Sequence, residues 1–377
     1  MASDGSYRAE VIGSLLRPAE VKQAMQEAAE GKLGRDELER VQDRAILDAI
    51  ALQEACGLDV ITDGEYRRAI FWDPVIAAVD GLEYQTTSPV GFGSSKDAVQ
   101  LPAVMGKLGL RESLLQRELR FLLDHTDRPV KATLPAMAQA SALWLPGVSE
   151  GAYPTREEFV ADLVEIMRGE IAALVGLGVR YIQLDSPRYT YVCSDEGRAR
   201  LRELGIDDPE AWLGEMIAFD NRLIEGDASR GVTFGLHLCR GNHRSMWSVE
   251  GAYDPIAEQL FNELKVHRLL LEYDTPRAGT FAPLRLVPDD KAVVLGLIST
   301  KDARVETRDE ILRRIEEAAR YMPIERLALS PQCGFASTLP GNLLGEAEQR
   351  QKLELVASVA REVWGEGERG DKDSSSS

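Results

Sequence analysis

Four side chains that can bind a metal stand at the ends of three apolar, β-rich runs in this sequence of 377 residues. His237 and Cys239 end the first run, Glu272 ends the second, and Cys333 follows the third. One imidazole, two thiols and one carboxylate form a donor set that zinc prefers. Residues two apart on a strand point to the same face, so His237 and Cys239 can reach the same ion. The spacing therefore predicts a zinc site among these side chains.

The same four residues also have purely structural explanations. Free cysteine is often buried as a small apolar side chain, which applies to both cysteines of the set. His237 could be a core histidine with satisfied hydrogen bonds. Glu272 could pair with an arginine, because an unpaired carboxylate is costly to bury. The other histidines of the second half, His243 and His267, are expected in loops or at the surface.

Composition restricts the partners and the location of the chain. It carries 62 acidic and 44 basic residues, and this net charge of −18 disfavours binding to nucleic acids and to anionic membranes. The first residues lack the basic and apolar regions of a signal peptide, and no apolar run approaches the length of a membrane span. We therefore expect a cytoplasmic protein whose partners are small molecules. In that compartment four cysteines favour metal binding or burial over disulfides.

Eight short β-branched runs alternate along the chain with stretches of helical spacing. The clearest helix covers 155–177, where Thr155 is the expected N-cap, Glu158 follows three residues later and Gly178 marks the end. Eight strand and helix pairs are typical of a single (β/α)8 TIM barrel, which is an α/β fold. The predicted strands are residues 9–13, 59–63, 129–134, 180–185, 232–239, 268–273, 292–299 and 326–330, and the other main helical stretches are 35–56, 208–226, 306–320 and 346–364.

Three regions lie outside this repeat. Helical stretches before the second strand would pack outside or beneath the barrel. A Gly/Ser/Pro-rich piece at 86–98 and a β-like run at 101–108 predict a hairpin inserted between strands 2 and 3, near the barrel mouth. The polar segment 365–377 has no apolar anchor and is expected to be a disordered tail, which leaves 1–364 as one barrel domain. Two smaller α/β domains are the alternative.

The polar residues that follow the predicted strands fall where a barrel has its active site. In such barrels the loops after the carboxyl ends of the strands converge on the axis. A barrel could gather these residues in one mouth, whereas two separate domains would scatter them. In strand order they are Gly13 and Ser14, Asp63 and Glu65, Thr133, Asp185, His237 and Cys239, Glu272, Ser299 and Thr300, and Cys333.

These motifs together resemble the zinc-bearing catalytic barrel of cobalamin-independent methionine synthase, over nearly the whole length of the chain. The resemblance rests on Val-Ile-Gly-Ser at 11–14, Asp-Gly-Glu-Tyr-Arg at 63–67, Ile-Gln-Leu-Asp at 182–185, the His-Leu-Cys run, Glu272, and Ser-Pro-Gln-Cys-Gly at 330–334. It implies that His237, Cys239, Glu272 and Cys333 are zinc ligands. It also implies a pocket for a thiol substrate, lined by Ile12, Gly13, Ser14, Glu65 and Asp185.

The chemistry implied by the resemblance is alkyl transfer to a thiol. A free thiol with a pKa of about 8.5 is mostly protonated at neutral pH, whereas a zinc-bound thiol is a thiolate that can attack an alkyl carbon. Four protein ligands would close the ion, so one must yield or the shell must expand. Glu272 is the expected ligand to yield, because a carboxylate is a harder and more weakly held donor than a thiolate.

The chain differs from full-length methionine synthases, which resemble two such barrels in tandem. With one barrel, a folate methyl donor is doubtful. Asp185 is followed by Ser-Pro and Arg188 in place of the expected Glu-Pro. An arginine is the natural partner of a sulfonate, carboxylate or phosphate, so Arg188 is a candidate substrate-binding residue. Two or three of the seven arginines that follow strand ends are expected to line the pocket and to make its mouth cationic: Arg17, Arg67, Arg68, Arg188, Arg240, Arg244 and Arg277.

Size, the single barrel and the zinc motif make the chain most similar to the epoxyalkane:coenzyme M transferases, also called 2-hydroxypropyl-coenzyme M lyases. This similarity predicts that the thiolate of coenzyme M opens a short epoxide, with Asp185 or Glu65 as the catalytic acid that supplies or relays a proton. Both acids also suit the ammonium group of homocysteine, which coenzyme M lacks. The alternative is therefore a methionine synthase-like methyltransferase that moves a methyl group to homocysteine.

A different class of protein stays open from sequence. The barrel could be a porphyrinogen decarboxylase-like relative without zinc catalysis, or the zinc could be structural in a binding protein. Arginines at the mouth suit the decarboxylase, which has no need of the His-x-Cys and Cys set. Homo-oligomers are compatible with single-barrel relatives, although no segment of the sequence identifies an interface.

Overall fold

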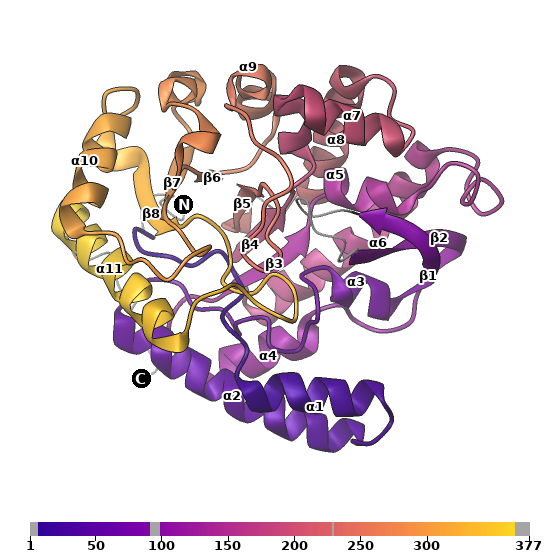
Figure 1. Cartoon of the computed structure of the whole chain (residues 1–377). Helices are drawn as coiled ribbons and strands as arrows, with labels where there is room; N and C mark the ends of the chain where they lie inside the picture. The colour runs from indigo at the N-terminus through magenta and orange to yellow at the C-terminus, as the bar shows by residue number, and fades with distance from the viewer. Residues whose placement is uncertain (1–6, 91–98, 228–229, 366–377) are drawn as a thin grey trace.

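The computed structural model describes residues 7–90, 99–227 and 230–365 of the chain. Its centre is a six-stranded parallel sheet in the order β3-β4-β5-β6-β7-β8, in which each strand pairs with the next along the sequence (Figure 1). Every residue of these strands is buried. The strands are β3 (Lys131–Pro135), β4 (Tyr181–Asp185), β5 (Thr233–Leu238), β6 (Arg268–Glu272), β7 (Ala292–Ile298) and β8 (Leu327–Pro331). Six of the eight predicted strands are therefore present in the predicted order.

The first two predicted strands occur as short extended segments with isolated pairings. Ala9 forms a parallel bridge with Leu329 in β8, and Ile61 forms one with Val130, directly before β3. The backbone N–H of Asp59 donates to the carbonyl oxygen of Ala9 at 2.9 Å, which joins the two segments to each other. Backbone contacts thus run from β8 through both segments to β3, although neither segment is long enough to count as a strand.

Helices surround the parallel sheet, and each of the main predicted helical stretches is present. Thr155 caps the longest predicted helix as expected, since its hydroxyl accepts a hydrogen bond from the backbone N–H of Glu158. Gly178 ends that helix at a φ of +106°, a backbone conformation that favours glycine. The helices are α1 (Ala19–Ala29), α2 (Arg35–Cys56), α3 (Asp73–Ala78), α4 (Gln116–His125), α5 (Met137–Ala140), α6 (Arg156–Leu177), α7 (Asp195–Glu203), α8 (Pro209–Ile224), α9 (Asp254–Glu263), α10 (Arg308–Ala318) and α11 (Glu346–Trp364), with short 3-10 turns η1 (Ser141–Leu143), η2 (Tyr189–Cys193), η4 (Pro276–Ala278), η5 (Ala282–Leu286) and η6 (Ile324–Arg326).

The segments outside the sheet occupy the places that the sequence predicts. Helices α1 and α2 lie together at one side of the molecule, in the lower part of Figure 1. A two-stranded antiparallel sheet, β1 (Val79–Val90) with β2 (Val99–Leu110), stands between the segment around residue 61 and β3, as the hairpin prediction requires. The turn of this hairpin lies outside the described residues. The predicted tail, apart from Gly365, also lies outside them.

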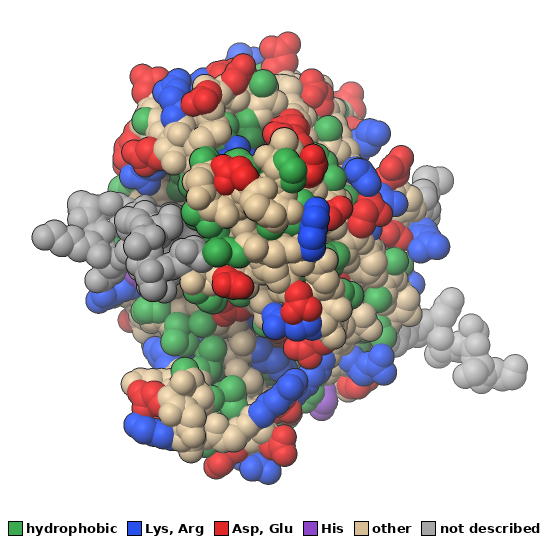
Figure 2. Space-filling model, turned by 90° about the vertical axis from the view of Figure 1, so that its right-hand side faces the viewer, with side chains coloured by type: hydrophobic (Ala, Val, Ile, Leu, Met, Phe, Trp, Pro, Cys, Tyr) green, Lys and Arg blue, Asp and Glu red, His purple; other side chains and the backbone are tan. Residues whose placement is uncertain are grey.

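On the face shown in Figure 2, acidic and basic side chains are interspersed, and the described residues there form no continuous basic surface. Within the described ranges, no helix combines the length and the apolar character that crossing a bilayer requires.

A buried cluster of charged and polar side chains connects the first extended segment to three strands of the parallel sheet. The Glu10 carboxylate accepts hydrogen bonds from Lys131 Nζ at 2.9 Å, from Arg268 Nη2 at 3.0 Å and from the Tyr181 hydroxyl at 2.9 Å. All four residues are buried, and they come from the segment after Ala9 and from β3, β4 and β6. Burial alone would raise the pKa of Glu10, but the charges of Lys131 and Arg268 lower it below its usual range. The first segment is thereby fixed to three strands.

Removing this carboxylate should destabilise the fold. Glu10→Gln leaves two buried cations without their counter-charge, so we expect the free energy of unfolding to fall by about 3–5 kcal/mol. Urea denaturation measures the change. The control is Glu37→Gln on the exposed face of α2, which should alter stability by less than about 0.5 kcal/mol. Equal stability of the two variants would show that the cluster contributes nothing.

Candidate metal centre

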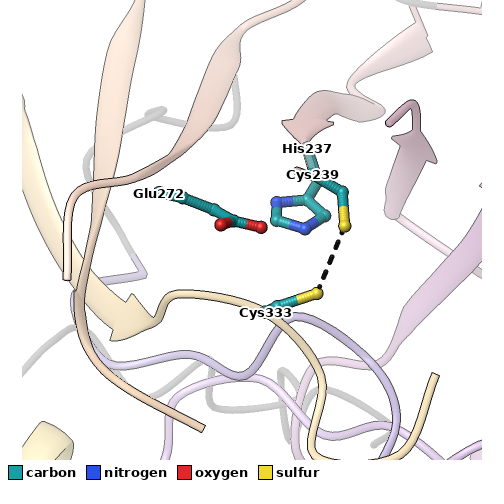
Figure 3. A group of neighbouring side chains, drawn as sticks. All are labelled: His237, Cys239, Glu272 and Cys333. Atoms are coloured by element: carbon teal, nitrogen blue, oxygen red, sulfur yellow. Dashed lines mark hydrogen bonds between the residues drawn. The ribbon is translucent and has the colours of Figure 1, made fainter. Parts of the chain in front are cut away.

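The four predicted ligands meet at the carboxyl ends of the three strands β5, β6 and β8. His237 lies in β5 and Cys239 directly after it, Glu272 ends β6, and Cys333 follows β8 by two residues. Their ligand atoms all lie within 4.8 Å of one another, and all four residues are buried. The two sulfur atoms are 3.5 Å apart, and the four side chains point toward a common space in Figure 3.

The histidine of this cluster has a nitrogen left over for a ligand bond. Its Nδ1 is 3.3 Å from the carbonyl oxygen of Leu270, and its Nε2 is buried without a hydrogen-bond partner. A carbonyl that accepts from Nδ1 fixes the tautomer whose Nε2 carries a free lone pair, which is the usual arrangement of a metal-bound histidine. Together with two thiols and one carboxylate, His237 gives a donor set that fits a zinc ion.

Fixed charges compensate the acidic groups of the cluster. Glu272 Oε2 accepts from Arg277 Nη2 at 3.0 Å, and its Oε1 accepts from the backbone N–H of Arg240 at 3.0 Å. Burial alone would raise the pKa of Glu272, but the positive charges around it, with Arg277 the strongest, lower it. The hydrogen bond with Cys239 lowers the pKa of Cys333. Glu272 therefore both pairs with an arginine and lies in the donor cluster.

A polar contact network joins the two loops that carry the sulfur atoms. Lys301 Nζ donates to the Gly241 carbonyl oxygen at 3.1 Å and to Asn242 Oδ1 at 3.0 Å. Asn242 Nδ2 in turn donates to the carbonyl oxygen of Gly334 at 2.7 Å and to Ser337 Oγ at 3.1 Å. This network holds the loop after β5 against the loop after β8 and so fixes the separation of the two sulfurs.

Sequence reasoning missed both residues at the centre of this network. Asn242 stands three positions after Cys239, and Lys301 directly follows the Ser-Thr pair at the end of the predicted seventh strand. Their position after strand ends was the available signal. Nothing in the residue types shows that they contact each other, because the contact spans 59 positions of the chain.

One pocket brings all six predicted substrate-binding residues to the cluster. Its wall includes Ile12, Gly13, Ser14, Glu65, Asp185 and Arg188, together with three of the four candidate ligands. Glu272 is fully buried and is absent from the pocket wall, so it lies behind the other three. Residues that the sequence did not single out also line the pocket: Ile70, Phe71, Trp72, Gln139, Tyr191 and Asn242.

The two pocket acids are both buried. Glu65 accepts a hydrogen bond from Thr133 Oγ1 at 2.8 Å, and its backbone has a φ of +57°, which is unusual for a residue other than glycine. A Cβ atom on Gly13 would lie 2.6 Å from Glu65 Oε1, so only glycine permits this approach. Asp185 accepts from Gln183 Nε2 at 2.8 Å. Burial raises the pKa of Glu65, and it raises the pKa of Asp185 to about 7.

The mouth of the pocket is less cationic than the arginines in the sequence led us to expect. Only Arg188 among them lines the pocket. Arg17 donates to the Glu65 and Ala336 carbonyl oxygens, and Arg68 pairs with Glu118 and lies 3.6 Å from the carboxylate of the pocket acid Glu65. Arg67 pairs with Asp43, Arg240 stacks on Tyr253, Arg244 is exposed, and Arg277 pairs with the candidate ligand Glu272.

The remaining histidines and cysteines lie outside the cluster. His267 accepts from the backbone N–H of Phe234, as a structural side chain would. His243 stands in a loop as expected but is buried, with Nδ1 2.9 Å from Thr338 Oγ1. Cys56 ends α2 and is buried.

Fold and site together define an α/β protein with a thiol-rich candidate metal centre in a pocket at the carboxyl ends of its strands. Residues 8–362 match the family described as "Cobalamin-independent synthase, Catalytic domain", and the chain belongs to this family. It is 36% identical over 361 residues to the uncharacterized protein YxjH of Bacillus subtilis, with 95% of each chain covered. Methionine synthase of Pyrococcus abyssi is 25% identical over 359 residues, which cover 95% of this chain and 93% of the relative. A solved structure of a putative vitamin-B12 independent methionine synthase from Listeria monocytogenes aligns with a TM-score of 0.71 at 28% identity, covering 95% of this chain and 98% of the other.

Loss of either sulfur should abolish tight metal binding without unfolding the protein. Cys239→Ala and Cys333→Ala each remove one donor from the cluster, so the purified variants should retain much less than one zinc per chain. Metal analysis and circular dichroism provide the two readings. Cys193→Ala removes another buried thiol and should bind zinc like the wild type. Loss of structure together with loss of metal would indicate a structural ion.

The loop network predicts an effect on metal affinity from a residue that touches no candidate ligand atom. Lys301→Met should weaken zinc binding about tenfold, because Asn242, which joins the two sulfur-bearing loops, loses the cation that holds its Oδ1. Competition with a chromogenic chelator measures this affinity. The control is Lys291→Met, another buried lysine, whose Nζ also donates to backbone carbonyl oxygens. Similar affinities for the two variants would remove the positioning role of Lys301.

Proposed function

We propose that this protein is a zinc-dependent methyltransferase that moves a methyl group to the sulfur of a small amino thiol such as homocysteine. The observation that supports this most is the position of the donor cluster. Its ligand atoms lie within 4.8 Å of one another, and three of its four residues line a pocket that also holds two buried carboxylates. Family membership and full-length relatives named methionine synthase favour this reaction over the opening of an epoxide by coenzyme M.

The proposed metal ligands are His237, Cys239, Glu272 and Cys333. A bound zinc ion would hold the substrate thiol as a thiolate at neutral pH. Glu272 accepts hydrogen bonds from Arg277 and from the Arg240 N–H. These partners would compensate its charge once it left the metal, which supports the hypothesis that this carboxylate is the ligand that gives way to the substrate.

The amino acid part of the substrate fits the residues next to the cluster. Glu65 and Asp185 are buried acids, and an ammonium group between them would restore the charged form that burial disfavours. The backbone N–H groups of Gly13 and Ser14 line the same pocket and have no acceptor among the described residues, so they can bind a carboxylate. These residues would hold the thiol substrate, and the methyl group would come from a second molecule.

Coenzyme M is the second candidate thiol, and one observation favours it. Arg188 lines the pocket and is the natural partner for a sulfonate. In that reaction Asp185 or Glu65 would protonate the alkoxide that ring opening produces. The two acids would however have no ammonium group to bind, and for this reason homocysteine is our first proposal.

The backbone contacts at the two sheet edges support a closed barrel. Because Ala9 pairs with β8 and Ile61 pairs with the residue before β3, we propose that the first two segments complete a single (β/α)8 barrel over residues 1–364. The six strands, the two bridges and the helices outside them fit this arrangement (Figure 1).

The proposed thiol substrate can be tested by removing one charged group at a time. Zinc-loaded protein should bind homocysteine at least about tenfold more tightly than 4-mercaptobutyrate, which lacks only the amino group. Asp185→Asn and Glu65→Gln should each reduce that preference, as measured by calorimetry. The control is Asp43→Asn, which should keep the full preference because Asp43 is not part of the pocket wall. Gln183→Glu would be unsuitable as a control, because Gln183 donates a hydrogen bond to Asp185. Binding of coenzyme M alone would move the proposal to epoxide opening, and binding of no thiol would refute alkyl transfer.

A further inference from the structure

The pocket holds two buried polar side chains that the proposed thiol site does not use. Arg188 is 4% exposed, and its guanidinium group has no acceptor and no acidic partner among the described residues. Its described contact is with the ring of Tyr191, 5.0 Å from the guanidinium carbon to the ring centre. Gln139 is 3% exposed, and its Oε1 is buried without a donor. A buried cation and a buried acceptor that both lack partners are costly unless a ligand satisfies them.

These two residues line the same pocket as three of the candidate ligands. Asp185 is the last residue of β4, and Arg188 lies three positions further along the loop. Gln139 lies in α5, four positions after the end of β3. A molecule bound to Arg188 and Gln139 would therefore share the pocket with a thiol that is held at the cluster.

Apolar side chains form another part of the wall of this pocket. The rings of Phe71 and Trp72 stack with their centres 5.6 Å apart, and both residues line the pocket with Ile70 and Pro187. Such a surface binds a flat or apolar group. Besides the cluster and the two acids, the pocket thus offers an apolar face, one cation and one hydrogen-bond acceptor.

A buried carboxylate holds the two polar residues in place from behind. Asp220 in α8 accepts from the backbone N–H of Met137 at 2.7 Å and from the Tyr189 hydroxyl at 2.6 Å. Met137 begins the helix that carries Gln139, and Tyr189 directly follows Arg188. The elements that carry the two side chains are therefore fixed to one another before any ligand binds, as a preformed subsite requires.

We propose that Arg188 and Gln139 form the subsite for the second substrate, the methyl donor, and that this donor carries an anionic group. The carboxylate, sulfonate or phosphate of the donor would bind Arg188, a neighbouring N–H or O–H would donate to Gln139 Oε1, and its apolar body would pack on Phe71 and Trp72. This assignment rests on the proposed methyl transfer. It disfavours donors with a net positive charge, because Arg188 would repel them and Arg200 adds a second positive charge near it.

The anion could instead belong to the thiol substrate, as the sulfonate of coenzyme M would. The two sources make different predictions for competition. An anionic group of the donor must bind together with homocysteine, whereas an anionic group of the thiol must be displaced by it. The same measurement therefore assigns the subsite to one reactant.

The test uses small aromatic anions as probes of the zinc-loaded, full-length protein saturated with homocysteine. Benzoate, benzenesulfonate and phenylphosphonate are titrated by calorimetry, with benzamide as the neutral counterpart. At least one anion should bind and should bind about 10- to 100-fold more weakly to Arg188→Met, with partial recovery in Arg188→Lys. Benzamide should bind both proteins alike. The control residue Arg198 pairs with Glu210 and is not part of the pocket wall. Arg198→Met removes the same charge there and should bind the anions like wild type.

Gln139 is tested with the three aminobenzoates. At least one of them should bind the wild type more tightly than benzoate and should lose this advantage in Gln139→Leu, which conserves volume. Circular dichroism confirms that each variant is folded.

The remaining outcomes overturn the proposal in distinguishable ways. Failure of every anion to bind, or equal binding by wild type and Arg188→Met, would show that the subsite takes no anion. Displacement of the anion by homocysteine would assign Arg188 to the thiol. Failure of homocysteine itself to bind would reject the proposed thiol while leaving the anion titrations readable in its absence, so the two failures are separate.

Discussion

The negative charge gathered in one buried cluster is the constraint on which the rest of this site depends. Two thiols and a carboxylate lie within 4.8 Å of each other with almost no contact with solvent. Such a group is tolerable only if cations or hydrogen-bond donors compensate it. Arg277 and a backbone N–H do so for Glu272, a hydrogen bond does so within the sulfur pair, and a metal ion would complete the balance.

Strand register converts this electrostatic requirement into geometry. Asp185 in β4 pairs with His237 in β5, and Leu238 in β5 pairs with Leu271 in β6. Cys239 and Glu272 directly follow Leu238 and Leu271, so this register places them next to each other. Because parallel strands align their carboxyl ends, donors from positions nearly one hundred residues apart reach one point. The same pocket also holds two acids, the backbone at Gly13 and Ser14, and the side chains of Arg188 and Gln139.

Much of this arrangement could be predicted from the sequence because its signals are local. Alternating β-branched and amphipathic runs identified the six strands of the sheet, and Thr155 with Glu158 located a helix start to within one residue. Three of the four donors were identifiable because the chain has only four histidines and four cysteines, and three of these eight stand at strand ends. The first two strands were overestimated, since a β-like run does not reveal whether its neighbours allow more than one bridge.

The features that could not be predicted depend on contacts between distant parts of the chain. Arg17 was a candidate for the mouth, but it donates to the carbonyl oxygen of Ala336, 319 positions away, and so stabilises a loop. The tie between Lys301 and Asn242 has the same origin. Long side chains such as arginine and lysine can reach several partners, and only the folded chain decides among them.

Pairing between the two ends of the chain has a consequence for the order in which the protein is assembled. The segment at Ala9 pairs with β8, and the carbonyl oxygen of Ser14 accepts from the backbone N–H of Phe335, two residues beyond the last candidate ligand. During synthesis the N-terminal residues must therefore wait for more than three hundred others before they find their partners. The pocket wall and the fourth donor arrive in the same late event, so an incomplete chain can gather three donors but cannot yet enclose them.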